Sequence, residues 1–327
     1  MKEFRDYDVQ YPNLIVDILE YFNASQGDKP EKKNIKEFCD KYSKKGNKVQ
    51  YDTIVKICDI LYHNNILILI KTTGPMDMCS VYLFYITDMN RWNTYKDYYI
   101  HYYNSLVYGF EYIYRAYKDI VLPIIAYKDG VPHMGSCFKC NKGIMTARHC
   151  LTDGETISIR GYTAEQLNRA VVYVSKNPNV DIAYIYTNEV TKIFTDKPHV
   201  LDEVLVMGYP MIPRFLDFCT AEKATISTIA DLRMTPSRGS ITAIADEIFT
   251  KDITELMLIT AKIKGGNSGG PVINKTGCVV GVSFSDPKGE GYSYDDLGYG
   301  IACPISVLDS IVEDGETLDV KFVDFEE

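Results

Sequence analysis

The stretch Gly265–Val272 (GGNSGGPV) is the most informative part of this 327-residue chain. A serine hydroxyl attacks a carbonyl only if it is exposed, lies next to a base and faces hydrogen-bond donors for the developing oxyanion. Glycines on both sides of Ser268 allow a tight turn with positive φ and let a substrate come close. They also leave consecutive backbone N–H groups able to point at one spot. The stretch therefore predicts that Ser268 is a nucleophile carried on a turn.

Two earlier segments supply the partners that such a serine needs. Thr146–Cys150 (TARHC) follows an apolar run and contains His149, which is a candidate base. Asp181–Tyr186 (DIAYIY) opens an apolar strand with a carboxylate. The chain order is therefore histidine, aspartate, serine.

Together these segments resemble the three signature segments of chymotrypsin-like serine proteases. Gly208–Pro210 (GYP) and Gly300–Pro304 (GIACP) resemble in particular the HtrA-type and bacterial trypsin-like branch of that family. The resemblance covers roughly residues 120–312 and implies a double β-barrel that hydrolyses peptide bonds. No PDZ domain, which is usual in the HtrA family, is expected after this region.

The resemblance also implies a role for each site residue. Ser268 attacks the scissile carbonyl, and His149 takes its proton and passes it to the leaving amine. Asp181 holds the tautomer of the histidine and stabilises the imidazolium. The backbone N–H groups of Gly266 and Ser268 form the oxyanion hole.

Two residues are candidates for substrate binding. Ser283, within Gly281–Phe284 (GVSF), matches the edge strand that aligns a substrate backbone by β-augmentation. Lys262 stands six residues before the nucleophile, where the family sets the base of the specificity pocket. A buried ammonium there would favour an acidic side chain at the cleavage position, whereas an ammonium that reaches solvent would not.

Two residues depart from the family pattern. Asn267 stands where trypsin-like zymogens keep an aspartate that receives a freed N-terminus, which favours control by loop ordering over activation by cleavage. Met134 stands where the disulfide partner of Cys150 is expected. This second departure fits a reducing compartment.

The first 90 residues predict three helices followed by a β-hairpin. Apolar residues recur at helical spacing, and the runs Ile66–Ile70 and Val81–Ile86 are rich in β-formers. The helical stripes contain Leu14, Ile15, Ile18, Leu19 and Phe22; Ile35, Phe38, Cys39 and Tyr42; and Ile54, Val55, Cys58, Leu61 and Tyr62. This order resembles a winged helix, so we expect a winged-helix-like domain over residues 1–90.

The charges of this domain favour a protein contact over DNA readout. The third helix offers Lys56 against Asp52 and Asp59, and residues 28–56 hold nine lysines and five acids but no arginine. Bidentate guanine recognition usually uses arginine. We therefore expect residues 1–119 to dock an activating protein partner, with nucleic acid as the less favoured alternative.

The remaining chain divides into three parts. Residues 91–119 predict one long tyrosine-rich linker helix, which packs on its own chain or forms a dimer seam. Residues 120–312 contain short β-rich runs that predict two six-stranded barrels. Residues 313–327 predict an acidic, solvated tail, with an internal competitor for the Lys262 pocket as the alternative. The expected fold is thus α+β and multidomain: a winged-helix-like domain, then an all-β double barrel of the chymotrypsin type.

The composition excludes several other activities. A net charge of −9 argues against nucleic acid or an anionic membrane as the main ligand. The N-terminal residues lack the pattern of a secretory signal, and nine cysteines in loose spacing indicate reduced thiols, so we expect a cytoplasmic protein. Cys137 and Cys140 with Cys150 give three of the four ligands that structural zinc needs, so buried thiols are favoured and neither metal nor cofactor is expected.

Three other functions are weighed against a protease. An α/β-hydrolase esterase needs a histidine after the serine, and no histidine follows Ser268. A catalytically silent scaffold with a protease fold, and a DNA-binding regulator with a self-cleaving protease, stay as alternatives. The favoured function is a regulated endopeptidase that cuts a specific protein or peptide substrate. Its layout resembles protease modules of bacterial stress and defence systems.

Overall fold

The structure is a computed structural model of the chain. It describes residues 10–24, 33–47, 49–71, 80–177, 180–210, 212–213, 230–231, 233–245, 256–284 and 298–325. The chain divides into two compact units, residues 1–112 and 113–327, and each unit is described by itself. None of the described helices is long and apolar enough to cross a membrane.

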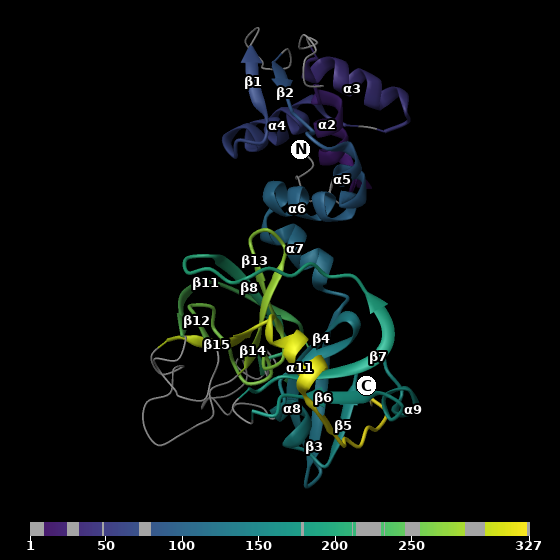
Figure 1. Cartoon of the computed structure of the whole chain (residues 1–327), viewed down its shortest axis with the longest axis vertical. Coiled ribbons are helices and arrows are strands. Elements are labelled where there is room, and N and C mark those ends of the chain that lie inside the picture. Colours follow the sequence, from purple (N-terminus) through teal and green to yellow (C-terminus); the bar gives the residue numbers. More distant parts are fainter. Residues whose placement is uncertain are drawn as a thin grey trace, which may run out of the picture. The chain divides into compact units, whose positions relative to one another are not determined.

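From α2 onward, the described part of the first unit has three helices followed by a hairpin, as the sequence predicts (Figure 1). Its elements are α2 (Leu14–Phe22), α3 (Ile35–Lys44), α4 (Tyr51–His63), β1 (Ile68–Lys71) and β2 (Val81–Leu83). The two strands pair antiparallel, and the predicted turn between them (72–78) lies outside the described residues. The winged-helix identity of this arrangement stays a prediction.

The helices form because their apolar residues meet in one core. The predicted stripes of α2 and α3 are buried, whereas Val55 of α4 lies at the margin of this core and Tyr62 is exposed. Gly46, with φ of +89°, follows α3 in the left-handed conformation that a glycine adopts without steric cost. Asn23, directly after α2, bridges Phe84, so the segment after α2 lies beside the one that follows β2.

The prediction of one long helix over residues 91–119 is wrong. The structure has three helices instead: α5 (Met89–Thr94), α6 (Lys96–Tyr108) and α7 (Phe110–Tyr117). Gly109 separates the last two with φ of +64°, outside the helical region. Trp92 of α5 stacks on Tyr99 of α6 with ring centroids 4.6 Å apart. This contact between two helices adds packing that one straight helix would not provide.

The described part of the second unit contains two six-stranded β-sheets, of which one is a closed barrel and the other is open, and a two-stranded ladder, so the prediction of two six-stranded barrels is confirmed in part. The first is a six-stranded sheet in the order β16-β6-β7-β4-β3-β5. Its strands are β3 (Val121–Lys128), β4 (Val131–Thr146), β5 (Thr156–Ile159), β6 (Val171–Val174), β7 (Ala183–Thr191) and β16 (Glu316–Leu318). Short helices α8 (His149–Thr152), α9 (Ala164–Leu167) and α11 (Val307–Asp314) connect or flank these strands.

The second sheet is a closed barrel in the order β11-β12-β15-β14-β13-β8. Its strands are β8 (Glu203–Gly208), β11 (Thr235–Ala245), β12 (Leu256–Ile259), β13 (Pro271–Asn274), β14 (Val279–Phe284) and β15 (Gly300–Pro304). Inward-facing residues of these strands, among them Val204, Val206, Ile241, Met257 and Val280, form its core. Beside it, β9 (Ile212–Pro213) and β10 (Ala230–Asp231) form a minimal ladder.

The expectation of a solvated C-terminal tail is wrong for β16 and Phe322, whereas the acidic side chains around them are exposed. β16 pairs with β6 at one edge of the first sheet, and Phe322 bridges Ile157 of β5 at the other edge. The N–H of Ile157 donates to Lys321 O at 2.9 Å, and the N–H of Val323 donates to Ile157 O at 2.8 Å. Phe322 is 3% exposed. The acidic segment therefore contains apolar residues at the positions that complete this sheet.

Candidate active site

His149 and Asp181 form the best-defined pair of the site. His149 opens the short helix α8, and Asp181 stands just before β7. The Nδ1 atom of His149 lies 2.5 Å from Asp181 Oδ2. The backbone N–H of His149 donates to Asp181 Oδ1 at 2.8 Å, and that of Arg148 donates to Asp181 O at 3.2 Å. The aspartate thus fixes both the ring and the start of the helix that carries it.

This contact sets the protonation behaviour of His149. Burial favours the neutral ring, but the hydrogen bonds to Asp181 and Cys150 outweigh burial and raise the pKa of His149 above its ordinary value of 6.5. A carboxylate at this distance favours the imidazolium over the neutral imidazole. The pair is therefore built to stabilise the charge that appears on a histidine base when it accepts a proton.

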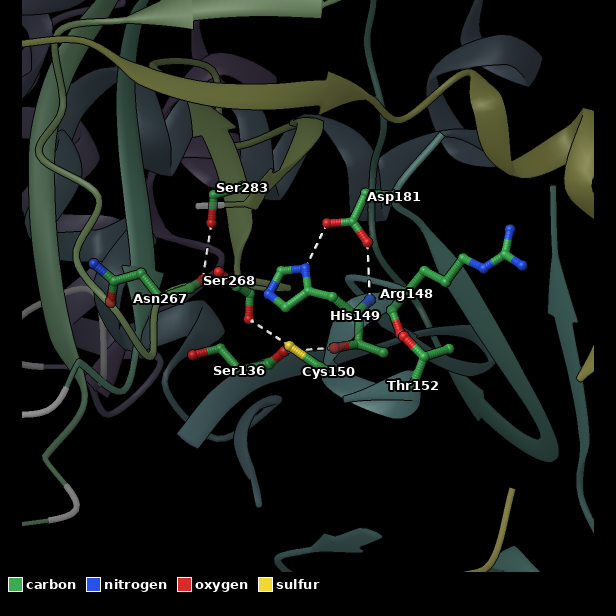
Figure 2. Close-up of polar contacts among 10 residues, drawn as sticks. Ser136, Arg148, His149, Cys150, Thr152, Asp181, Asn267, Ser268 and Ser283 are labelled. Atoms are coloured by element: carbon green, nitrogen blue, oxygen red, sulfur yellow. Dashed lines mark hydrogen bonds and ion pairs between the residues drawn. The ribbon is translucent and has the colours of Figure 1, made fainter. Parts of the chain in front are cut away.

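Ser268 lies on the opposite side of the imidazole. In Figure 2 the ring of His149 lies between the Asp181 carboxylate and Ser268. The structure thus brings together the three residues that the sequence singles out. Ser268 lies in the turn between β12 and β13 and is only 3% exposed, which differs from the exposed hydroxyl that the sequence predicts.

Two glycines of this turn adopt a positive φ, and one of them also leaves no room for a side chain. Gly266 and Gly269 adopt φ of +99° and +87°. A Cβ atom on Gly269 would also lie 2.0 Å from Ser136 O and 2.4 Å from Thr146 Oγ1. Gly269 therefore lets the nucleophile turn pack directly against β4. The assignment of the Gly266 and Ser268 N–H groups as an oxyanion hole stays a prediction.

Ser136 of β4 supports the turn, and sequence reasoning missed it. It is fully buried. Its Oγ atom donates to Gly266 O at 2.6 Å and accepts from the N–H of Tyr209 at 2.8 Å. Its backbone N–H donates to Ser268 O at 2.7 Å. The only sequence signal was a serine beside glycine in an apolar run, which does not distinguish it from an ordinary strand residue.

The predicted substrate role of Ser283 is wrong. β14 is not an edge strand, because it pairs with β13 on one side and with β15 on the other. The Ser283 N–H donates to Gly270 O at 2.8 Å, and its carbonyl accepts from the Gly269 N–H at 2.6 Å. Both backbone groups are therefore used within the barrel, and the side chain is fully buried.

Lys262 does not provide a buried ammonium. It is exposed, whereas its neighbours Ala261 and Ile263 are buried. The apolar side chains of this segment face the barrel core, and the lysine faces outward. This corresponds to the alternative in which the ammonium reaches solvent, so the electrostatic argument for an acidic cleavage preference no longer holds.

The cysteines near the site are reduced thiols. Cys150 is buried, and its Sγ atom lies 3.5 Å from Ser268 O. Cys137 and Cys140 are both buried in β4, where burial raises the pKa of each thiol. Within the described segments, no group of three or more histidines, cysteines or acids is placed to hold a metal ion.

Comparisons with known proteins agree with this geometry. Residues 135–282 match the family described as the trypsin-like peptidase domain. The DegP-like periplasmic serine endoprotease of Rhizobium meliloti is 26% identical over 184 residues, which cover 53% of this chain and 31% of that protein. The mitochondrial protease Do-like 3 of Arabidopsis thaliana is 35% identical over 132 residues, which cover 39% of this chain and 19% of that protein.

A solved structure is also similar. The active form of the Rv3671c protease from M. tuberculosis is 19% identical, with a TM-score of 0.44, and the match covers 64% of this chain and 86% of that chain. The chain spans less than a third of the length of the two curated relatives. From the family match and the DegP-like and Do-like relatives, we conclude that this chain contains a trypsin-like serine peptidase domain.

Proposed function

We propose that the chain is a serine endopeptidase that hydrolyses peptide bonds of a specific protein through Ser268, His149 and Asp181. The observation that carries this proposal is the placement of one imidazole between a carboxylate 2.5 Å away and the serine of a glycine-lined turn. All three side chains come from one compact unit, residues 113–327.

The geometry supports the usual two-step acyl transfer. His149 accepts the Ser268 proton as the hydroxyl oxygen bonds to the scissile carbonyl carbon, and it then gives that proton to the departing amine. Water repeats the sequence on the acyl-enzyme and releases the second product. Asp181 holds the ring through Nδ1, which leaves Nε2 for the serine, and it stabilises the imidazolium of both steps.

Reaction with a fluorophosphonate probe tests the nucleophile. We expect the full chain to be labelled and the Ser268→Ala variant to lose labelling, because the probe forms a bond only with an activated serine. Ser158→Ala is a matched control, since Ser158 is a fully buried serine of β5 in the same unit. A wild-type chain that stays unlabelled, or labelling that persists in Ser268→Ala, would contradict the proposal.

We also propose that residues 1–119 dock an activating protein partner and that residues 1–90 form a winged-helix-like module. The helix, helix, helix, hairpin order supports the module. Exposed apolar side chains on its hairpin, Ile68 and Ile70, support a protein contact. We place the protein in a reducing, cytoplasmic compartment, because the seven cysteines of the described segments are reduced thiols.

A further inference from the structure

Two buried serines hold the backbone of the nucleophile turn from opposite sides. Ser136 comes from β4 of the first sheet, and Ser283 comes from β14 of the closed barrel. Both are fully buried. Their hydrogen bonds end on three consecutive carbonyl groups, those of Gly266, Asn267 and Ser268. The turn is thus fixed peptide by peptide.

The middle peptide is the one that matters for the oxyanion. The Ser283 Oγ atom donates to Asn267 O at 2.9 Å and lies 3.1 Å from Gly270 O (Figure 2). The Gly270 N–H also donates to Asn267 O, at 2.9 Å. This carbonyl is therefore held toward the interior of the barrel by two donors.

Because a peptide unit is planar, fixing the Asn267 carbonyl also fixes the direction of the Ser268 N–H. The described chain has no cis peptide bonds, so the Asn267–Ser268 unit is trans. In a planar trans peptide the N–H points opposite to the C=O. Because the Asn267 carbonyl is drawn toward β14, the Ser268 N–H points away from β14. This N–H is one of the two groups, with the N–H of Gly266, that the sequence predicts as the oxyanion hole.

The two flanking peptides are held in the same way. Gly266 O accepts from Ser136 Oγ at 2.6 Å, while the N–H of the same peptide, on Asn267, donates to Lys264 O at 2.9 Å. Ser268 O accepts from the Ser136 N–H at 2.7 Å, while the N–H of that peptide donates to Ser283 O. The middle peptide therefore lies between two fixed neighbours and has little freedom to rotate.

We propose that Ser283 is a positioning residue for the oxyanion hole, because its hydroxyl holds the Asn267 carbonyl and thereby aims the Ser268 N–H. Ser136 supports this arrangement, because it donates hydrogen bonds to the carbonyls of the two neighbouring peptides, Gly266 O and Ser268 O. This inference rests on the proposed peptidase function and gives Ser283 a role in place of substrate binding. Ser283 itself touches neither substrate nor reacting atoms.

The test compares Ser283→Thr with Ser283→Val. The two variants add the same extra bulk at a fully buried position, but only threonine keeps the hydroxyl. Loss of one oxyanion donor lowers kcat by about 10²–10³. For a donor that is present but poorly aimed, we expect Val to reduce kcat and the fluorophosphonate labelling rate by about 10–100-fold, with KM on dye-labelled casein unchanged. Thr should stay within about threefold of wild type on the same argument.

Three outcomes keep the inference separate from the proposed function. Equal labelling rates for Thr and Val, or a loss confined to KM, would overturn the positioning role. Ser283→Ala removes the hydroxyl without adding bulk, so it serves if both larger variants fail to fold, and a wild-type rate in Ala would also overturn it. A wild-type chain that is not labelled at all contradicts the peptidase function instead.

Discussion

The two sheets of the peptidase unit contribute to the site in different ways. The first sheet supplies the base and the acid, which are joined by short side-chain and backbone contacts around Asp181. The closed barrel supplies the nucleophile, which stands on a turn whose own backbone carbonyls accept the hydrogen bonds that hold it. One half of the site thus depends on electrostatics, and the other depends on peptide geometry.

The sheets also differ in how they are completed. The closed barrel uses six strands from residues 203–304. The first sheet uses β3 to β7 and then needs the segment 316–323, which runs along β6 and reaches β5. Damage to the base and acid can therefore come from the C-terminal segment, whereas damage to the nucleophile turn can come from Ser136 of the first sheet.

The largest effect should come from the electrostatic half. Asp181→Asn keeps the shape of the pair but removes the charge that stabilises the imidazolium, so we expect kcat to fall by about 10⁴-fold. Catalysis needs the neutral ring, so wild-type activity rises with pH through the raised pKa of His149. In the variant that pKa falls, and the rising limb of the pH–rate profile moves to lower pH.

The same substitution has a stability consequence with a defined sign. Because the pKa of His149 is raised in the folded state, the pair stabilises the protein fully below the unfolded pKa, near the ordinary value of 6.5. That contribution disappears as the pH rises through the folded pKa. Urea unfolding at a series of pH values should show a wild-type advantage over Asp181→Asn that shrinks at high pH. If the pH–rate profiles of the wild type and of Asp181→Asn rise at the same pH, the Asp181 carboxylate does not control the pKa of His149.

The next effect tests how the first sheet is completed. Phe322→Ala removes a buried side chain from the segment that reaches β5, and such truncations cost about 3–5 kcal/mol. We expect a loss of this size in urea unfolding of the full chain. Phe325→Ala is the matched control, since Phe325 is only partly buried and lies under the Arg160 guanidinium, 5.2 Å from its ring centroid. Equal losses for the two variants would mean that the bridge to β5 adds little.

The smallest effect tests whether the C-terminal segment influences the base. Arg148, next to His149, has its guanidinium 3.8 Å from Glu316 of β16, and the Glu316 side chain is 53% exposed. Exposed ion pairs contribute about 0–1 kcal/mol, so Glu316→Gln should change both stability and kcat very little. Glu313→Gln, on exposed α11 surface, is the control. A kcat loss greater than about tenfold, confined to the Glu316 variant, would show that β16 acts on the active site.

Sequence reasoning was most reliable where a local pattern carries the information. Glycines around Ser268, the TARHC segment and the carboxylate before an apolar strand locate the three side chains that the structure brings together. The buried stripes of α2 and α3 were likewise visible as helical spacing. In each case the residues that decide the structure lie within a few positions of one another.

Sequence reasoning failed where the contact that decides the structure joins residues far apart in the sequence. Ser283 was taken for a substrate-aligning residue because nothing in GVSF reveals that β15 pairs on its other side. Ser136 was missed because its partners, Gly266 and Ser268, lie far along the chain. Phe322 was assigned to a solvated tail because the surrounding acids hide its contact with β5. Gly109 was expected to lie within one long helix, but its positive φ separates α6 from α7.

The closing of the first sheet by residues 316–323 has a consequence for synthesis on the ribosome. Phe322 and Asn168 exchange hydrogen bonds although they are 154 positions apart. The edge of β6 likewise stays open until β16 has been synthesised, because β16 is the strand that pairs with it, and contacts of such long range form late. A nascent chain would then carry its histidine and aspartate on an incomplete sheet until residues 316–323 have emerged from the ribosome and can pair.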